Sequence, residues 1–534
     1  MSCKRSFSTS RRQFLQTAAT AAMGSGMPAT IASLAAGGEA GPSKTRQVSL
    51  RAPQIFVDLH GMKISENVDH EFHAATKHPQ NPVLSGEYEW ERKMGGPCGS
   101  FIYDPQEKLF KVWYQGITGD NYGQPDAGGP YSLNYAVSQD GVHWEKPMLG
   151  IHEFSWKGRS TRQNNIVVPT IHHNGKDHWE SVLQDTTASD PAARYKAIGW
   201  SSNDPGKEGW CQTAGHCGIW SMTSPDGLRW THCAEPIFHY RPRPDTEDIG
   251  PIGDAQSLMI DTTAERYVAF LRGSGPTQGK RVFSTSTDFV NWSPLGISME
   301  LFGHGSLYNH TGFHYGDSYL GLLTHYFVDG DDVHQLVLRL LTSRDGLRFR
   351  LAQGDTRNAP PLVDTGPIGE WDRFMVMLTG GPPIQVGDQL YIYYRGFSET
   401  HNRSGTKPSD SYYAGGHGLA TIRVDGFASV AAGFDGGHVT TDLLSFEKPP
   451  RGGESALTIN GKADHHARIV VEVLDEQGQP VPGFGKDDCI PLIDDQVRHI
   501  VRWRDKSHLG ELSERPIRLR FHLINARLFS YTVG

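Results

Sequence analysis

The chain alternates between short apolar segments and polar turns, and the stretch 253–292 shows this pattern most completely. Small and apolar residues at 255–260 meet a polar turn at 261–265, and a second segment at 266–271 is rich in aromatic and branched side chains. A loop then leads to a third segment at 281–286. Short apolar runs of this composition, bounded by polar turns, are typical of β-strands. The stretch therefore predicts one complete sheet unit.

The same unit recurs along the chain, because its turn and its second strand both return in fixed order. The turn has the pattern Ser-x-Asp-Gly-x-x-aromatic, and its copies stand at 138–144, 224–230, 286–292 and 343–349, with a weaker copy at 424–427. A matching second strand precedes each turn, at 108–116, 194–200, 266–273, 318–327 and 389–396. Two features that repeat together are typical of a repeat architecture. The sequence therefore predicts an all-β fold with a five-bladed β-propeller.

The turn residues are expected to shape the backbone rather than to take part in chemistry. A short polar side chain can bond turn amides, and a glycine after aspartate suits a positive φ. The aspartates of the four stronger copies are therefore interpreted as turn-forming residues: Asp140, Asp226, Asp288 and Asp345. We expect the aromatic residues that end these turns to pack at equivalent places between blades: Trp144, Trp230, Trp292 and Phe349.

Residues 1–40 resemble an export signal. Arg11 and Arg12 precede Phe14 and Leu15, and residues 16–36 are mildly apolar and rich in alanine and glycine. This pattern is similar to a twin-arginine signal peptide, and a disordered basic tail is the alternative. No other apolar run approaches the roughly 20 residues that span a bilayer, so we expect no membrane contact of the mature form. The protein is therefore expected to be periplasmic or extracellular.

The remaining chain is divided into a lead-in segment, the propeller and a second domain. Residues 41–95 include Pro79 and Pro82, which favour an extended and rigid path toward the first blade. The propeller, which we take as the catalytic domain, is expected over 96–435. From 440 to 534, alternating strands without a cluster of acids and histidines predict a C-terminal β-sandwich that contributes nothing to the chemistry.

Composition and charge narrow the class of protein. With 61 Gly and 32 Pro in 534 residues, the chain is rich in turns. A formal net charge of −8 argues against nucleic acid or an anionic membrane as a partner. Of the 6 cysteines, Cys3 leaves with the signal, and the odd number that remains forbids complete pairing. Cys211, His216 and Cys217 lack a second pair of metal ligands, so a structural role, such as a disulfide within 211–233, is favoured over a metal site.

Loops at one end of the propeller supply the candidate functional residues. In an antiparallel four-stranded blade, the start of the first strand and the loop between the second and third strands lie at the same end. The loops in question are long, polar and aromatic, as is usual for sites built on a rigid scaffold. With their neighbours they contain a dense set of carboxylates and imidazoles: Glu91, Glu180, Asp245, Glu247, Asp248, Asp254, His304, His310, Glu370, Asp372, Glu399 and His401.

Several motifs resemble a known superfamily. The run HPQNPVL at 78–84, the pair WE at 90–91, the aromatic second strands and the repeated turns are similar to those of five-bladed propeller glycoside hydrolases. These include invertases, arabinanases and mannoside phosphorylases, and the similarity covers roughly 55–430. The invertase motifs WMNDPNG, RDP and EC are absent, so fructan specificity is not expected. The resemblance implies acidic residues at the starts of the inner strands.

Glycosidic cleavage, which this resemblance implies, needs two carboxyl groups. One donates a proton to the leaving oxygen, and the other attacks the sugar or activates water. Asp254 heads an apolar inner strand and is predicted as base or nucleophile, with Glu91 and Asp372 as candidates for the acid and for the residue that tunes it. We expect the three acids to converge at one end of the central funnel. A salt bridge or a turn cap is the alternative role for Glu91 and Asp372. The residues expected to contact sugar are Trp113, His310, Tyr394, Glu399 and His401.

The sequence thus predicts a secreted glycoside hydrolase acting on a poly- or oligosaccharide. Two alternatives stay open: a propeller that binds polysaccharide without cleaving it, and a glycoside phosphorylase. Phosphorolysis would need cations such as Arg373 and Arg395 directed at a phosphate. No residue pattern requires a cofactor or assigns a metal ligand, and a central structural ion stays open. For His310, a buried core histidine is favoured over a metal ligand.

Overall fold

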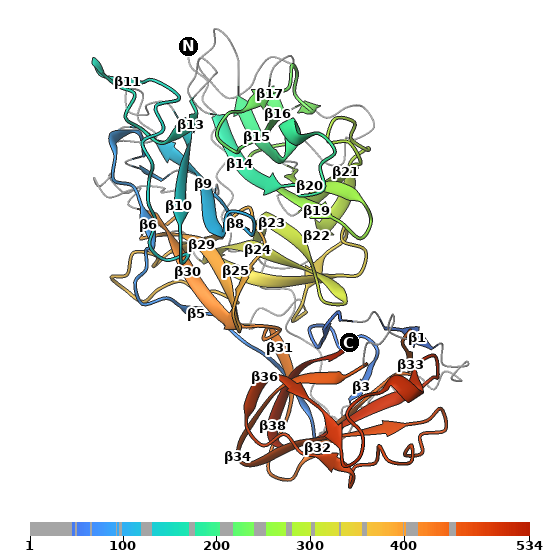
Figure 1. The fold of residues 1–534 in the computed structure, drawn as a ribbon. Helices are drawn as coiled ribbons and strands as arrows, with labels where there is room; N and C mark the ends of the chain where they lie inside the picture. Colours follow the sequence, from blue (N-terminus) through green and yellow to red (C-terminus); the bar gives the residue numbers. More distant parts are fainter. Residues whose placement is uncertain are drawn as a thin grey trace, which may run out of the picture. The chain divides into compact units, whose positions relative to one another are not determined.

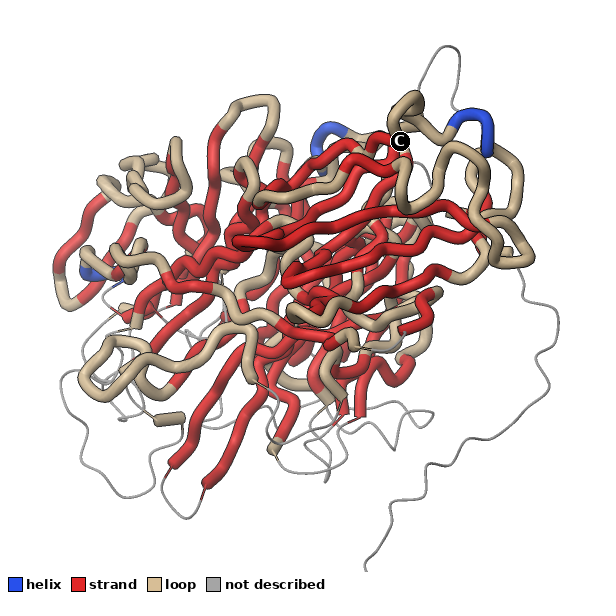
Figure 2. Tube along the Cα trace, turned by 90° about the horizontal axis from the view of Figure 1, so that it is seen from below, coloured by secondary structure: helices blue, strands red, loops and turns tan. Residues whose placement is uncertain are grey.

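The computed structural model is built almost entirely from β-strands and loops (Figures 1 and 2). It describes residues 45–48, 51–64, 67–91, 93–94, 99–118, 131–169, 177–202, 217–239, 252–273, 280–300, 305–329, 333–354, 360–398, 400–401, 415–447 and 455–534. Within these ranges the helical segments are short 3₁₀ turns: η1 (Glu89–Glu91), η2 (Pro191–Ala193) and η4 (Gly510–Leu512). None of the helices in this part of the chain is long and apolar enough to cross a membrane. The predicted all-β class is confirmed.

Three antiparallel sheets follow one another along the chain. The first contains β7 (Lys93–Met94), β8 (Ser100–Asp104), β9 (Leu109–Ile117), β10 (Tyr131–Ser138) and β13 (Ile166–Val168). The second contains β14 (Asp177–Gln184), β15 (Tyr195–Ser202), β16 (Cys217–Ser224), β17 (Thr231–His232) and β18 (Phe238–His239). The third contains β19 (Ser257–Asp261), β20 (Arg266–Arg272), β21 (Lys280–Ser286) and β22 (Gly296–Glu300). A small pair, β11 (Phe154–Trp156) and β12 (Arg159–Thr161), extends the loop after the first turn.

The next two strand groups are joined into one ten-stranded sheet, because β25 and β27 share the parallel pair Leu336 and Met375. The first group contains β23 (Ser306–Tyr315), β24 (Ser318–Asp329), β25 (Val333–Ser343) and β26 (Arg350–Leu351). The second contains β27 (Met375–Leu378), β28 (Ile384–Val386), β29 (Gln389–Phe397), β30 (Gly416–Arg423), β5 (Thr76–Lys77) and β6 (Leu84–Ser85). β5 and β6 come from the expected lead-in segment. That segment therefore supplies the outer edge of the last group.

The repeated turns have the geometry that their sequence predicts. In the first copy, Ser138 Oγ accepts from Gly141 N at 2.9 Å, and Asp140 Oδ1 accepts from Val142 N and His143 N at 2.8 Å each. The same bonds recur in the other three copies. Gly141 has a φ of 77°. These aspartates are therefore turn-forming residues, as interpreted from the sequence.

Hydrogen bonds join neighbouring strand groups at or near their first strands. The order of contact follows the chain, from β8 to β14, β19, the β23–β24 hairpin and β27, and the last group returns to the first. The five bonds are Val182 N to Ser100 Oγ (2.8 Å), Leu258 N to Ser181 Oγ (3.0 Å), Ser257 Oγ to His310 O (2.6 Å), Leu378 N to Thr324 Oγ1 (2.9 Å) and Gly380 N to Gly99 O (2.5 Å). The strand groups therefore close a ring.

Aromatic side chains pack between the groups. The residue that ends each turn contacts the group that precedes its own. Trp144 lies edge-on to Tyr393, with ring centroids 6.0 Å apart, and Trp292 lies edge-on to Phe238 at 5.7 Å. The other two pairs are Phe349 with Phe270, at 5.6 Å, and Trp230 in one apolar cluster with Trp113. The four aromatics thus occupy corresponding positions around the ring.

The C-terminal residues form an eight-stranded sheet with strands from two earlier parts of the chain. Its members are β2 (Gln54–Ile55), β3 (Met62–Ile64), β4 (Asp69–Phe72), β31 (Ala428–Ala432), β32 (Gly437–Thr441), β34 (Leu457–Leu474), β36 (Asp495–Ile500) and β38 (Arg518–Val533). Two small pairs lie beside it, β1 (Arg46–Gln47) with β33 (Leu444–Ser445) and β35 (Cys489–Ile490) with β37 (Arg502–Trp503).

The domain boundaries expected from the sequence do not coincide with the limits of this sheet, at either its N-terminal or its C-terminal strands. β31 lies inside the range expected for the propeller, and β2 to β4 lie inside the expected lead-in segment. The physical reason is that β4 and β5 run directly beside β31 and β30, so a pair of antiparallel strands continues from the ring into the C-terminal sheet (Figure 1). Strand pairing between segments so far apart in sequence leaves no local pattern to mark it.

The turn glycines allow a test of this packing. Gly227 has a φ of 76°, and a Cβ built there would lie 2.5 Å from Trp113 Cζ2. Gly354 has a φ of 75° with no atom within 4 Å of such a Cβ. A left-handed conformation costs about 1–2 kcal/mol for a residue with a side chain, so Gly354→Ala is expected to lose this amount. Gly227→Ala is expected to lose about 1–3 kcal/mol more through overpacking. Urea unfolding of both variants measures the difference, and equal losses would contradict the described contact between the turn and Trp113.

Candidate active site

Asp254 lies in the turn before β19 and is held by an arginine. Its Oδ1 accepts from Arg272 Nη1 at 2.9 Å, and the Asp254 side chain is 25% exposed. The Arg272 guanidinium also lies over the Tyr308 ring, 4.9 Å from its centroid. A carboxylate fixed by one guanidinium bond and still open to solvent can meet a ligand. Asp254 is therefore a partly exposed carboxylate fixed by one guanidinium.

Glu180 of β14 fixes the backbone that carries Asp254. Its two carboxylate oxygens accept from Ala255 N at 2.8 Å and from Gln256 N at 2.7 Å, and Glu180 is 1% exposed. Ala255 has a φ of 75°, in the left-handed region that costs about 1–2 kcal/mol for a residue with a Cβ. Each of these two hydrogen bonds contributes about 0.5–1.5 kcal/mol, so together they offset this strain. Glu180 is therefore a positioning residue for Asp254.

The environment of Glu180 favours its protonated form. Burial raises the pKa of Glu180 well above its usual range, and the nearby charge of Asp254 raises it further. The backbone N–H groups of Ala255 and Gln256 and the charge of Arg281 act in the opposite direction. Burial and the neighbouring charge of Asp254 therefore favour a proton on Glu180.

Arg281 ties the same turn to β23. It is fully buried, and its Nη2 and Nη1 donate to Ala255 O at 2.5 Å and to Tyr308 O at 2.8 Å. Burial, together with the charge of Arg272, lowers the pKa of Arg281 to about 9, so the guanidinium stays charged at neutral pH. Tyr308 therefore receives two arginines, one at its carbonyl and one over its ring.

His401 is the predicted sugar-contacting residue that the structure brings to this site. Its Nε2 lies 3.3 Å from Tyr308 Oη, and its ring stands edge-on to Tyr308 and Tyr326 at 5.1 and 5.2 Å. Aromatic rings beside a carboxylate suit the apolar face of a sugar. The neighbouring candidate Glu399 lies outside the described residues.

Glu91 does not join this site. It is 0% exposed, and its Oε1 accepts from Lys146 Nζ at 2.7 Å and from the backbone of Glu87 and Tyr88. Its Oε2 accepts a short hydrogen bond from Tyr114 Oη. With both oxygens occupied and no exposure, Glu91 cannot reach a glycosidic oxygen. The expectation of an acid or tuning residue is corrected: Glu91 acts as a buried salt bridge and turn cap.

Asp372 lies in a second network of the same kind. Its Oδ2 accepts from Lys77 Nζ at 2.6 Å and from Tyr394 Oη at 2.9 Å, and its side chain is 3% exposed. Asn81 Nδ2 donates to the same Tyr394 oxygen at 3.1 Å. Burial and the charge of Asp372 raise the pKa of Tyr394, so its hydroxyl stays a donor. The expected catalytic role of Asp372 and sugar contact of Tyr394 are therefore corrected to a structural link, and no described contact joins either residue to Asp254.

Two further predicted sugar contacts are buried elsewhere. Trp113 is 0% exposed and donates through Nε1 to Gly227 O at 2.6 Å, so its indole packs between the first two sheets. His310 is 0% exposed, lies 4.6 Å from the Phe270 ring and has Nε2 2.9 Å from Ser298 Oγ. Burial lowers the pKa of His310 well below its usual range, as does the charge of Arg281. Neither side chain presents a surface to a sugar, so both expectations are corrected.

Sequence reasoning did not assign roles to Glu180, Arg272, Arg281 or Tyr308. A signal for Glu180 exists, since Trp179-Glu180 repeats the pairs Trp90-Glu91 and Trp371-Asp372. The arginines stand in strands β20 and β21, where sequence alone does not tell an inward guanidinium from a solvated one. Their roles follow from contacts across the turn before β19.

The described residues contain no group of three or more His, Cys, Asp or Glu side chains that could hold a metal ion. Cys233 is a free cysteine, while Cys211 and His216 of the sequence cluster lie outside the described residues. A central ion therefore stays an open question from the sequence, with no ligand set assigned.

No protein-family profile matches the chain, and no curated protein matches it. One similar solved structure comes from a family of mannoside phosphorylases that contains glycoside hydrolases targeting β-1,2-mannosidic linkages in Candida mannan. It is 14% identical to this chain, with a TM-score of 0.44, and the match covers 66% of this chain and 94% of that chain. A glycosyl hydrolase from Bacteroides ovatus has 13% identity and a TM-score of 0.45 over 66% and 94%. A β-1,2-mannobiose phosphorylase from Listeria innocua has 11% identity and a TM-score of 0.42 over 66% and 97%. All three structures are at most 14% identical to this chain, with TM-scores no higher than 0.45, so they assign no family to it.

The raised pKa of Glu180 predicts a dependence of stability on pH. The folded protein keeps a proton on this carboxyl above the pH at which the unfolded chain, with a pKa near about 4.3, loses it. Stability from this group is therefore complete below about pH 4 and falls as pH rises toward the folded pKa. Glu180→Gln cannot lose a proton, so its melting temperature relative to the wild type should rise between about pH 5 and pH 8.

The control for this prediction is Glu476→Gln, which changes an exposed glutamate of the C-terminal domain. Its melting temperature should follow that of the wild type across the same pH range. A constant offset between Glu180→Gln and the wild type at every pH would contradict the predicted titration of Glu180.

Proposed function

We propose that this protein is a carbohydrate-active enzyme that cleaves a glycosidic bond beside Asp254. In this proposal the ring of strand groups is a five-bladed β-propeller, and the C-terminal sheet belongs to a β-sandwich. The five repeated turns and the ring of inter-sheet hydrogen bonds support the first assignment. Residues 1–40 lie outside the described part of the chain, and export through a twin-arginine signal remains part of the proposal.

The observation that carries the proposal is the partly exposed Asp254 beside two buried or half-buried arginines, a buried glutamate and aromatic rings. Cleavage breaks the bond between the anomeric carbon and the leaving oxygen, which takes up a proton. Asp254 is the acid or base at this bond, Glu180 and Arg281 hold its backbone, and Arg272 orients its carboxylate. Tyr308 and His401 are proposed to contact the sugar.

Two routes differ in the group that attacks the anomeric carbon. In hydrolysis a second carboxylate acts as nucleophile or activates water, and Glu91 and Asp372 are too enclosed to do so. In phosphorolysis an oxygen of phosphate forms the new bond, and one carboxylic acid protonates the leaving oxygen. Arg272, 24% exposed beside Asp254, suits a phosphate. Arg395, which the sequence also suggested for this task, is 0% exposed beneath the Phe397 ring.

Asp254→Asn tests the proposal. The change keeps the size of the side chain and removes its charge, so the rate should fall by at least about two orders of magnitude. The melting temperature should change little, because a partly exposed pair with Arg272 contributes about 0–1 kcal/mol. Released sugar from a panel of plant, algal and fungal polysaccharides gives the readout, with and without phosphate in the buffer.

The matched control is Asp388→Asn, an exposed aspartate in the turn between β28 and β29. It should keep the wild-type rate. Full activity in Asp254→Asn would refute the assignment, and sugar release that requires phosphate would favour phosphorolysis over hydrolysis. Polysaccharide binding without release of any product would favour a non-catalytic binding propeller.

A further inference from the structure

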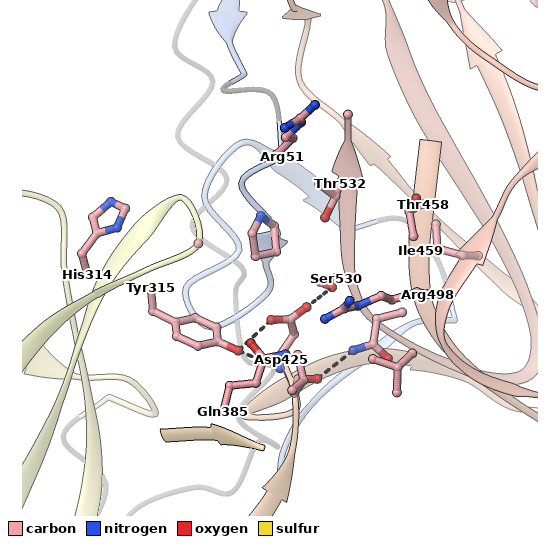
Figure 3. A pocket seen from close by; sticks show the side chains of 16 residues that line it. Arg51, His314, Tyr315, Gln385, Asp425, Thr458, Ile459, Arg498, Ser530 and Thr532 are labelled. Atoms are coloured by element: carbon pink, nitrogen blue, oxygen red, sulfur yellow. Dashed lines mark hydrogen bonds between the residues drawn. The ribbon is translucent and has the colours of Figure 1, made fainter. Parts of the chain in front are cut away.

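A cavity of about 580 Å³ lies where the ring meets the C-terminal sheet (Figure 3). The β23–β24 turn, β28 and the β30–β31 turn form one side, and strands β34, β36 and β38 form the other. Small-ligand sites have volumes of about 300–1,000 Å³, so the cavity is large enough for a small molecule or one sugar unit. None of the residues that position Asp254 lines it.

The floor of this cavity is a carboxylate whose oxygens are already bound. Asp425 Oδ1 accepts from Tyr315 Oη at 2.7 Å, and Asp425 Oδ2 accepts from Ser530 Oγ at 2.6 Å. Asp425 N donates to the same Tyr315 oxygen at 3.0 Å. Burial and the charge of Asp425 raise the pKa of Tyr315, so the hydroxyl keeps its proton. Both carboxylate oxygens of Asp425 are therefore held in place by hydroxyl donors.

The Asn460 side chain in the wall is also occupied. Asn460 Nδ2 donates to Val424 O at 2.7 Å, and its Oδ1 accepts from Arg423 Nε at 2.7 Å. Arg51 is exposed and lines the cavity, and its backbone N donates to Val533 O at 2.8 Å. The Asn460 amide therefore shapes the wall, and Arg51 adds a positive charge to it.

The Arg498 guanidinium is the charged group of the C-terminal sheet that faces the floor of this cavity. Arg498 is exposed on β36, lines the cavity and extends toward the Asp425 floor in Figure 3. Among the described residues no acid forms an ion pair with it. Thr458, Thr532 and Gln385 line the same space. Their hydroxyl and amide groups suit ligand hydroxyls, and a guanidinium suits a carboxylate in a two-point hydrogen bond.

We propose that this cavity binds an acidic sugar, with Arg498 on its carboxylate and the threonine and glutamine side chains on its hydroxyls. The site is separate from Asp254 and holds the saccharide without cleaving it. A hexuronate unit has the required combination of one carboxylate and several neighbouring hydroxyls. The proposal rests on the cavity itself and does not depend on the chemistry assigned to Asp254.

The test uses the mature full-length protein carrying Asp254→Asn, titrated with glucuronate and with glucose by calorimetry or ligand-observed NMR. The two sugars differ only at C6, which bears a carboxylate in one and a hydroxyl in the other. Glucuronate should bind at least about tenfold more tightly, equivalent to about 1.4 kcal/mol. Arg498→Gln, added to the same protein, should remove this preference. Arg502→Gln, an exposed arginine of β37 outside the cavity, should keep it.

Equal binding of glucuronate and glucose, no binding of either, or a preference that survives Arg498→Gln would overturn the proposal. If sulfate competes as effectively as glucuronate, the cavity selects its ligand by negative charge alone, and the sugar assignment is overturned as well. All binding measurements use the Asp254→Asn variant, which is expected not to cleave the saccharide. A failure here therefore leaves the proposed cleavage untouched, and loss of the proposed cleavage leaves this result standing.

Discussion

Neighbouring strand groups of the ring share few backbone hydrogen bonds, so side chains must hold adjacent groups together. Serine and threonine hydroxyls make most of the bonds between first strands, from Ser100 to Thr324. Each neutral hydrogen bond contributes about 0.5–1.5 kcal/mol. Glu180 adds two bonds to this set, because its carboxyl oxygens accept from Ala255 N and Gln256 N and so join β14 to the turn before β19. The candidate site is thus built on one of the links that close the ring.

The link between β14 and the turn before β19 explains the geometry of the candidate site. The turn that carries Asp254 takes a left-handed conformation at Ala255, which strain alone would oppose. Glu180 accepts the two turn amides, and Arg281 donates to the turn carbonyl, so the backbone is fixed from both sides. A reacting group held by rigid neighbours needs little reorganisation when a ligand arrives. In the proposed function, the partly exposed Asp254 acts on the ligand, while the buried Glu180 holds the backbone of the turn.

Local patterns in the sequence predicted what is formed locally. The turn aspartates and the glycine at 141 were interpreted correctly, because the bonds they make span two or three residues. The partners of Glu91 and Asp372 are far away in sequence, at separations of 55 residues to Lys146 and 295 residues to Lys77. No window of sequence reveals that these lysines enclose the two acids. Trp113 and Tyr394 were misassigned for the same reason, since a strand pattern does not tell which face meets a neighbouring sheet.

The most direct test is a crystal structure of the Asp254→Asn variant with a saccharide that the screen identifies. The account predicts that the amide of the variant lies within about 3 Å of the glycosidic oxygen, the distance expected of a group that moves a proton there. Arg272 and Tyr308 should line the same sugar unit. A glycosidic bond that lies away from the turn before β19, with no contact to this turn, would contradict the account.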